Sequence, residues 1–209
     1  MAGERRGSGG DGTLRVALVG APRQTVLSAS QMDDASLQRD LERDAVYGET
    51  AVLPRGSATA ARAVGGMILV TQDAARVTID AHGTITIVRP ATRPRERGDW
   101  VPALVEEDLR EDIAQAIRFA LSTLDRVLDP NERLSDVAIA AVLRDVGYAG
   151  WSTRAERDRN PNRIAMNMNA KEVIGARLDP LTRKRAAARQ QVEPMAAELT
   201  AILRREATE

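Results

Sequence analysis

The stretch LSDVAIAAVLRDVGYAGWSTRAERDRNPNRIAMNMNAKEVIGARL, residues 134–178, decides the predicted fold. Its first part carries apolar side chains at helical spacing, which predicts a helix over residues 136–146 that Ser135 caps. Glycines end this helix, and residues 151–159 are expected to form a short, arginine-rich second helix. Residues 163–168 and 172–178 then predict a β-hairpin. Helix, turn, short helix and hairpin form the element order of a winged helix-turn-helix.

Downstream, the chain predicts a helical region that begins at Asp179-Pro180, where the aspartate caps and the proline fills the first helical position. Pro194 is expected to kink this region or to split it into two helices. An apolar stripe continues toward the end of the chain through Val192, Met195, Leu199, Ile202 and Leu203. Such a stripe either packs on another helix of the same chain or serves as a docking surface for a partner, and the first alternative is the more common one.

Upstream, residues 103–128 show apolar residues in alternating steps of three and four, which predicts a long helix. Three carboxylates fall in its first turns, at Glu106, Glu107 and Asp108. They suit the positive end of a helix dipole, and we prefer this interpretation to a metal or acid–base site. The Pro- and Arg-rich residues 91–102 form the expected linker between two domains.

The N-terminal part predicts a small α+β domain over residues 13–90, preceded by a disordered segment at residues 1–12. We expect a helix over residues 30–47, a loop over residues 49–66 and strands at residues 14–20 and 67–71. Residues 76–80 and 84–88 alternate around a glycine turn, which predicts a hairpin. The predicted fold class is therefore α+β: a small N-terminal antiparallel sheet with one helix, followed by a helix-rich, winged-helix-like domain over residues 103–209.

Composition limits the classes of function more than it selects one. The 209-residue chain has no cysteine and a formal net charge of zero, which excludes thiolate chemistry and gives no overall attraction to nucleic acid or anionic membrane. It has no long apolar run and no apolar leader, so we expect a cytoplasmic protein without a membrane partner. Nearly all its positive charge is arginine, a bias typical of high-GC bacteria.

Motifs that carry chemistry are sparse. His82 is the only histidine and sits at the tip of the predicted hairpin, so a paired-histidine metal site is excluded. Residues 20–25 follow a strand as a phosphate-binding loop does, but no Gly-Lys-Ser/Thr follows. No nucleophile elbow is present. We therefore expect no catalytic residue, no metal and no cofactor, although an enzyme that uses only Asp, Glu, Ser and Arg stays open.

The candidate site is a cluster of basic residues. Residues 151–189 hold ten positive and four negative side chains in a chain that is otherwise neutral. A winged helix lays its second helix in the DNA major groove, where guanidinium groups bind guanine edges and phosphates. The predicted nucleic-acid-binding residues are Arg154, Arg157, Arg159, Arg163, Lys171, Arg183, Lys184 and Arg185. The alternative is a solvated face in which Glu156 and Asp158 form weak ion pairs with the arginines.

One resemblance supports a link to DNA. The motif Gly147-Tyr148-x-Gly150-Trp151-x-Thr153-Arg154-Ala155-Glu156, followed by Pro161-Asn162, resembles the C-terminal region of the actinobacterial Schlafen/AlbA-type DNA-binding proteins. The stretch at residues 100–108 is similar in kind. The AlbA-type domain, to which that family's DNA or nucleotide binding is attributed, is not recognisable here, so no site residue is carried over. The resemblance implies an accessory or stand-alone regulatory module.

Two functional hypotheses follow from these patterns. The first is a non-enzymatic bacterial regulatory module, acting in transcription, that binds DNA through residues 151–189. The second is a protein-interaction or self-association domain without nucleic-acid contact, which docks through the helices between residues 179 and 205. The first predicts an affinity that falls with salt, and the second predicts a change in mass when the apolar stripe is made polar.

Overall fold

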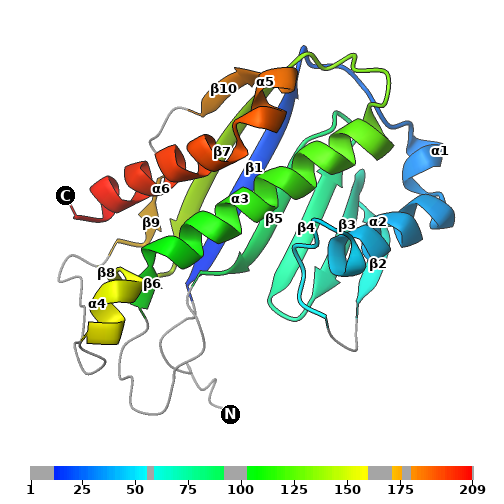
Figure 1. Cartoon of the computed structure of the whole chain (residues 1–209). Helices are drawn as coiled ribbons and strands as arrows, with labels where there is room; N and C mark the ends of the chain where they lie inside the picture. The colour runs from blue at the N-terminus through cyan, green and yellow to red at the C-terminus, as the bar shows by residue number, and fades with distance from the viewer. Residues whose placement is uncertain (1–11, 56–58, 92–102, 160–170, 176–179, 209) are drawn as a thin grey trace, which may run out of the picture.

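The strand β1 (Thr13–Ala21) runs through the middle of the molecule (Figure 1). The computed structural model describes residues 12–55, 59–91, 103–159, 171–175 and 180–208. Residues along β1 alternate between buried and more exposed positions, so one face of the strand is covered and the other is open. The predicted strand at residues 14–20 is confirmed, and of the predicted disordered segment only Gly12 lies within the described residues.

An eight-stranded sheet forms around β1, with the order β10-β7-β1-β5-β4-β3-β2 and with β9 paired to β7. All its pairs are antiparallel. The strands other than β1 are β2 (Ala60–Val64), β3 (Met67–Gln72), β4 (Ala75–Asp80), β5 (Ile85–Pro90), β7 (Asp136–Arg144), β9 (Val173–Ile174) and β10 (Leu181–Lys184). A separate parallel pair joins β6 (Ala103–Val105) to β8 (Gly150–Ser152).

Helices cover one face of the sheet. Figure 1 shows the long helices α3 and α6 lying side by side across β1, β5 and β7, with α2 over β2 to β4 on the same face. The helices are α1 (Ala29–Met32), α2 (Ala35–Tyr47), α3 (Glu106–Thr123), the π-helix η1 (Leu124–Leu128), α4 (Arg154–Arg159), α5 (Arg185–Gln190) and α6 (Val192–Thr208). In the described part of the chain no helix packs on the opposite face of the sheet, which we call the open face.

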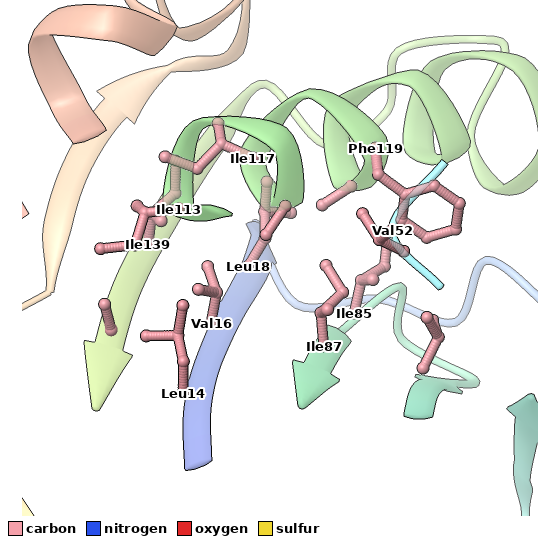
Figure 2. Close-up of a cluster of buried hydrophobic side chains, with 14 of the residues drawn as sticks. Leu14, Val16, Leu18, Val52, Ile85, Ile87, Ile113, Ile117, Phe119 and Ile139 are labelled. Atoms are coloured by element: carbon pink, nitrogen blue, oxygen red, sulfur yellow. The ribbon is translucent and has the colours of Figure 1, made fainter. Parts of the chain in front are cut away.

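The hydrophobic core fills the space between the sheet and the helices. Leu14, Val16 and Leu18 of β1 point toward α3, where Ile113 and Ile117 meet them (Figure 2). Ile85 and Ile87 extend this layer on β5, and Phe119 and Val52 close it on the helix side. One contiguous core therefore contains residues from both halves of the chain.

The predicted helix over residues 136–146 is wrong. These residues form β7, which lies between β1 and β10 and buries Val137, Ile139, Ala141 and Leu143 on the core side. Every position from 137 to 143 is apolar, so the sequence satisfies helical and strand periods equally well, and the pairing with β1 decides. Because the winged-helix order begins with this helix, the winged-helix prediction is not confirmed.

Other boundaries also shift. The predicted helix over residues 30–47 is two helices, because Asp34 caps α2 by accepting a hydrogen bond from the Ser36 N–H at 2.7 Å. The predicted loop over residues 49–66 contains β2. The predicted helix over residues 103–128 begins as the strand β6. The α+β class is confirmed. Residues 13–90 and 103–209 both contribute strands to one sheet, and residues from both parts pack in one core.

The C-terminal region, which was predicted to be helical from residue 179, begins with a strand. Residues 181–184 form β10 at the edge of the sheet, and α5 and α6 are separate helices that meet at Gln191. Pro194 lies in the first turn of α6, where its missing N–H costs little. The apolar stripe packs against α3, with Met195, Leu199 and Leu203 at most 3% exposed. The stripe is part of the core, which confirms the alternative that it packs on another helix of the same chain.

Candidate anion-binding surface

The predicted basic residues are mostly neutralised within the chain. Arg154 Nε donates to Asp108 at 2.8 Å and Arg154 Nη2 donates to Glu111 at 2.9 Å. Hydrogen bonds to Glu111 and Asp108 raise the pKa of the Arg154 guanidinium. Two more carboxylates lie in the first turn of α3. Glu106 accepts a hydrogen bond from the Trp151 indole N–H at 3.1 Å, and Glu107 accepts one from the Arg154 backbone N–H at 2.9 Å. These carboxylates therefore fasten β8 and α4 to the start of α3, besides suiting its dipole.

Three consecutive basic residues point in different directions. Arg183 lies on the core side of β10 and pairs with Glu198 of α6 at 3.1 Å. Lys184 pairs with Asp136 at 2.9 Å. Arg185 is 2% exposed and turns inward. Alternation along a strand thus separates the side chains that the sequence analysis places on one surface.

Arg185 anchors a buried ion-pair network instead of a ligand. Its guanidinium donates to Asp125 Oδ1 at 2.7 Å and to Asp129 Oδ2 at 2.8 Å. It also donates to the Asp129 and Leu134 backbone carbonyls at 3.0 and 3.3 Å. Arg189 adds a second bond to Asp125 at 2.7 Å. The network joins η1, the start of β7 and α5, and its role is structural.

The remaining predicted residues do not restore the predicted surface. Lys171 Nζ donates to the Glu206 carbonyl at the end of α6. Arg157 also has an interaction partner. Arg159 is exposed at the end of α4, and Arg163 lies outside the described residues. Side chains of the predicted site are therefore distributed over α4, β10 and α5 rather than gathered on a two-helix surface.

A different group of arginines lies on the open face. Strand register places Arg76 of β4 and Arg15 of β1 on either side of Val88 of β5. Two strand spacings separate the Cα atoms of these arginines, about 10 Å. Arg144 of β7 pairs with Thr13, so it is the diagonal neighbour of Arg15. We call Arg15, Arg76 and Arg144 the arginine triad.

The triad is not neutralised by the part of the chain that the structure describes. No carboxylate pairs with any of its three guanidinium groups there, and Arg15 Nε is buried without a hydrogen-bond partner. Burial, and then repulsion from Arg144 and Arg76, lowers the pKa of the Arg15 guanidinium. Arginine nevertheless keeps its charge in proteins, so this end of the open face carries three like charges. An anion bound between them would relieve that repulsion.

Acidic residues lie at the other end of the open face. Asp136 pairs in register with Ala21, at the far end of β1 from Arg15, and its carboxylate is bound by Lys184. Asp80 pairs in register with Met67, and its carboxylate accepts from the backbone N–H groups of residues 82 and 84. Within these strands the carboxylates of the open face lie away from the triad, and the turn residues Asp73 and Asp145, near Arg76 and Arg144 in the chain, do not pair with the triad in the described structure.

The face between these ends has small side chains. Ala17 pairs with Thr86 on one side and Ala140 on the other, and Thr78 continues the row. Arg62 on β2 stands at the end of this row, exposed and without a partner within the described residues. Leu69 of β3 lies between Thr78 and Arg62 in this row, so the short side chains are confined to the part of the face formed by β7, β1, β5 and β4.

The open-face arginines were missed because the signal for them lies in strand pairing. Arg15, Arg76 and Arg144 each stand beside a buried aliphatic residue in a strand, and this alternation is visible in the sequence. More than fifty residues separate each of them from the next along the chain. Only the order β4-β5-β1-β7 brings them to one end of one face.

A pocket of about 380 Å³ opens on the helix side of the sheet. Arg89 of β5 bonds there to Asp112 at 3.2 Å and to Gln115 at 3.3 Å, and Gln115 donates to the Ala51 carbonyl. Val52 and Leu53 supply apolar lining. Because Arg89 already pairs with a carboxylate, this pocket offers less attraction to an anion than the triad does.

Searches against family models, curated proteins and solved structures find no match for this chain. The resemblance to Schlafen/AlbA-type proteins therefore stays a prediction. Within the residues described, no group of three or more metal-ligating side chains gathers at one point. None of the described helices is both long enough and apolar enough to cross a membrane.

Proposed function

We propose that this protein is a non-enzymatic binding module that holds the phosphate backbone of a nucleic acid on the open face of its sheet. The arginine triad carries the proposal, because it concentrates three charges that no described carboxylate neutralises. Guanidinium groups suit phosphate oxygens, which accept two parallel hydrogen bonds from one planar fork. The proposal keeps the nucleic-acid function expected from the sequence and moves it to another surface.

Two further features support a nucleic-acid partner. Like charges at the triad disfavour pairing of this face with a second copy of itself. The apolar stripe of α6, which the sequence analysis offered for protein docking, is occupied by α3. Few side chains on the open face have the reach to read base edges, so we expect binding with little sequence preference, dominated by the backbone.

Salt dependence tests this function directly. We expect binding of a labelled oligonucleotide to weaken with added salt, with a log–log slope of about −2 to −4, because three or four arginines would displace condensed counterions. Changing Arg15, Arg76 and Arg144 together to Gln should reduce the magnitude of this negative slope by about one unit for each arginine. Fluorescence anisotropy over a series of salt concentrations measures both quantities.

A matched variant separates the open face from the surface predicted by sequence. Changing Arg154, Arg157 and Arg159 to Gln removes the same formal charge from α4, where Arg154 is already paired. This variant should keep most of the affinity and the slope. A loss of binding in the α4 variant with none in the triad variant would contradict the proposal and restore the earlier surface.

A further inference from the structure

Tyr148 has an exposed side chain in the turn that follows the triad end of β7. Its side chain is 59% exposed, although its neighbours Val146 and Ala149 are each only 3% exposed. The turn that holds it is well defined: the Asp145 N–H donates to the Glu172 carbonyl at 2.9 Å, and the Ala149 N–H donates to the Val146 carbonyl at 3.0 Å. A hydrogen-bonded turn that is anchored by the buried Val146 and Ala149 thus presents one exposed aromatic ring.

The turn leaves β7 directly after Arg144. Only three residues lie between Arg144 and Tyr148, and the four residue steps that join their Cα atoms span at most about 14 Å when fully extended. The Val146–Ala149 turn shortens this path further. A nucleic-acid strand whose phosphate binds Arg144 therefore passes within reach of the tyrosine ring.

The width of the open face argues against insertion into the DNA major groove. Seven strands lie side by side in the main path of the sheet, which makes a surface about 29 Å wide at the usual strand spacing. The DNA major groove is only about 12 Å wide, so this face cannot enter it. In a duplex the bases are also stacked inside, away from a ring at the edge of the protein. A single strand exposes both its backbone and its bases.

We propose that the nucleic acid bound on the open face is single-stranded, and that Tyr148 stacks on one of its bases while the arginine triad holds the adjacent phosphates. The inference rests on the proposed function and adds the class of ligand and a recognition residue to it. Stacking on an aromatic ring tolerates any base, which agrees with a surface that has little means of reading sequence.

The test compares two equally exposed tyrosines. Tyr148→Ala should weaken binding of a short labelled oligothymidine about 5- to 150-fold, the range expected for the loss of one stacked base, and should leave the salt slope unchanged. Tyr148→Trp should restore most of the affinity, since the ring and not the hydroxyl carries the contact. Tyr47, 60% exposed at the end of α2, is the matched control, and Tyr47→Ala should bind like the wild type.

The outcomes distinguish this inference from the proposed function. Wild-type affinity for Tyr148→Ala, together with a loss of binding in the triad variant, would overturn the stacking inference and leave the proposed function standing. Equal affinity for the duplex and the single strand would overturn the assignment of the ligand class. Binding that is insensitive to both salt and the triad would refute both. Unchanged thermal unfolding of the variants confirms that the measured effects concern binding.

Discussion

Arg185 shows how the environment of one residue decides its role. In the sequence it belongs to the run Arg183-Lys184-Arg185, which is typical of a phosphate-binding patch. In the structure it is 2% exposed, faces two carboxylates, and bonds to two backbone carbonyls. The triad arginines have the opposite environment, since each lies on a sheet face without a carboxylate partner in the described chain. Both kinds of arginine are charged, but only the second kind is available to a ligand.

Removal of Arg185 should be strongly destabilising. Arg185→Met removes one of the two arginine partners of Asp129, which is 0% exposed and keeps only Arg133, and it also removes a partner of Asp125. Breaking a buried pair in this way costs about 3–5 kcal/mol. Denaturant unfolding measures the change. Arg183→Met, which breaks the half-exposed pair with Glu198, is the control and should cost about 1 kcal/mol or less. Similar losses for both variants would argue against the anchoring role.

Asp125 of η1 and Asp129, the C-cap that follows it, contribute to the pH dependence of folding. Burial opposes ionisation of Asp125 and Asp129, yet hydrogen bonds outweigh it and hold both pKa values below the usual range. For Asp125 these bonds come from Arg189 and Arg185, and for Asp129 chiefly from the backbone N–H of Leu134 and the side chain of Arg133. An aspartate with a lowered folded-state pKa binds protons more readily in the unfolded chain, so unfolding is favoured as these groups become protonated.

We therefore expect stability to be constant above the unfolded aspartate pKa of about 4 and to fall as the pH drops below it. Asp34 and Asp136 are shifted in the same direction and add to this slope. Asp129→Asn tests the contribution of this carboxylate to the pH dependence of stability. The variant should be less stable at pH 7 and should lose less stability on acidification. Urea midpoints at several pH values between 7 and 3 measure both effects. An unchanged slope in Asp129→Asn would contradict this role.

The strands and helices differ in how far the sequence predicts them. The hairpin of β4 and β5 was predictable, because both arms alternate around a glycine turn with local pairing. So was α3, whose apolar period extends over many residues. β7 was not, because its uninterrupted apolar run suits a buried strand as well as a helix, and its partner β1 lies over a hundred residues away. The triad depends on that same long-range pairing, so the sequence analysis, which considered arginines that are close together in the chain, did not identify it.

At the scale of the whole molecule, the two faces of the sheet have different environments, because the described helices cover only one of them. The helix face of the sheet holds the core, and Figure 1 shows it covered by α3 from the middle of the chain and by α6 from the C-terminal part. The open face has no such cover in the described structure and carries Arg15, Arg76 and Arg144. Under the proposed function, stability and binding depend on different residues, and variants on one face should leave the other property unchanged.

Leu203 tests the structural half of this division. It is 0% exposed on α6 and lies against Gly175, whose backbone φ of +91° suits glycine and lets α6 approach the β7–β9 edge. Leu203→Ala should lower the free energy of unfolding by about 2–5 kcal/mol, because it leaves a cavity between α6 and the sheet. Arg205→Ala, on the exposed side of the same helix, should change it by less than about 0.5 kcal/mol. Denaturant unfolding measures both variants, and sedimentation should show the wild-type mass for each. If Leu203→Ala kept full stability but altered the mass, α6 would be a contact between chains rather than part of the core.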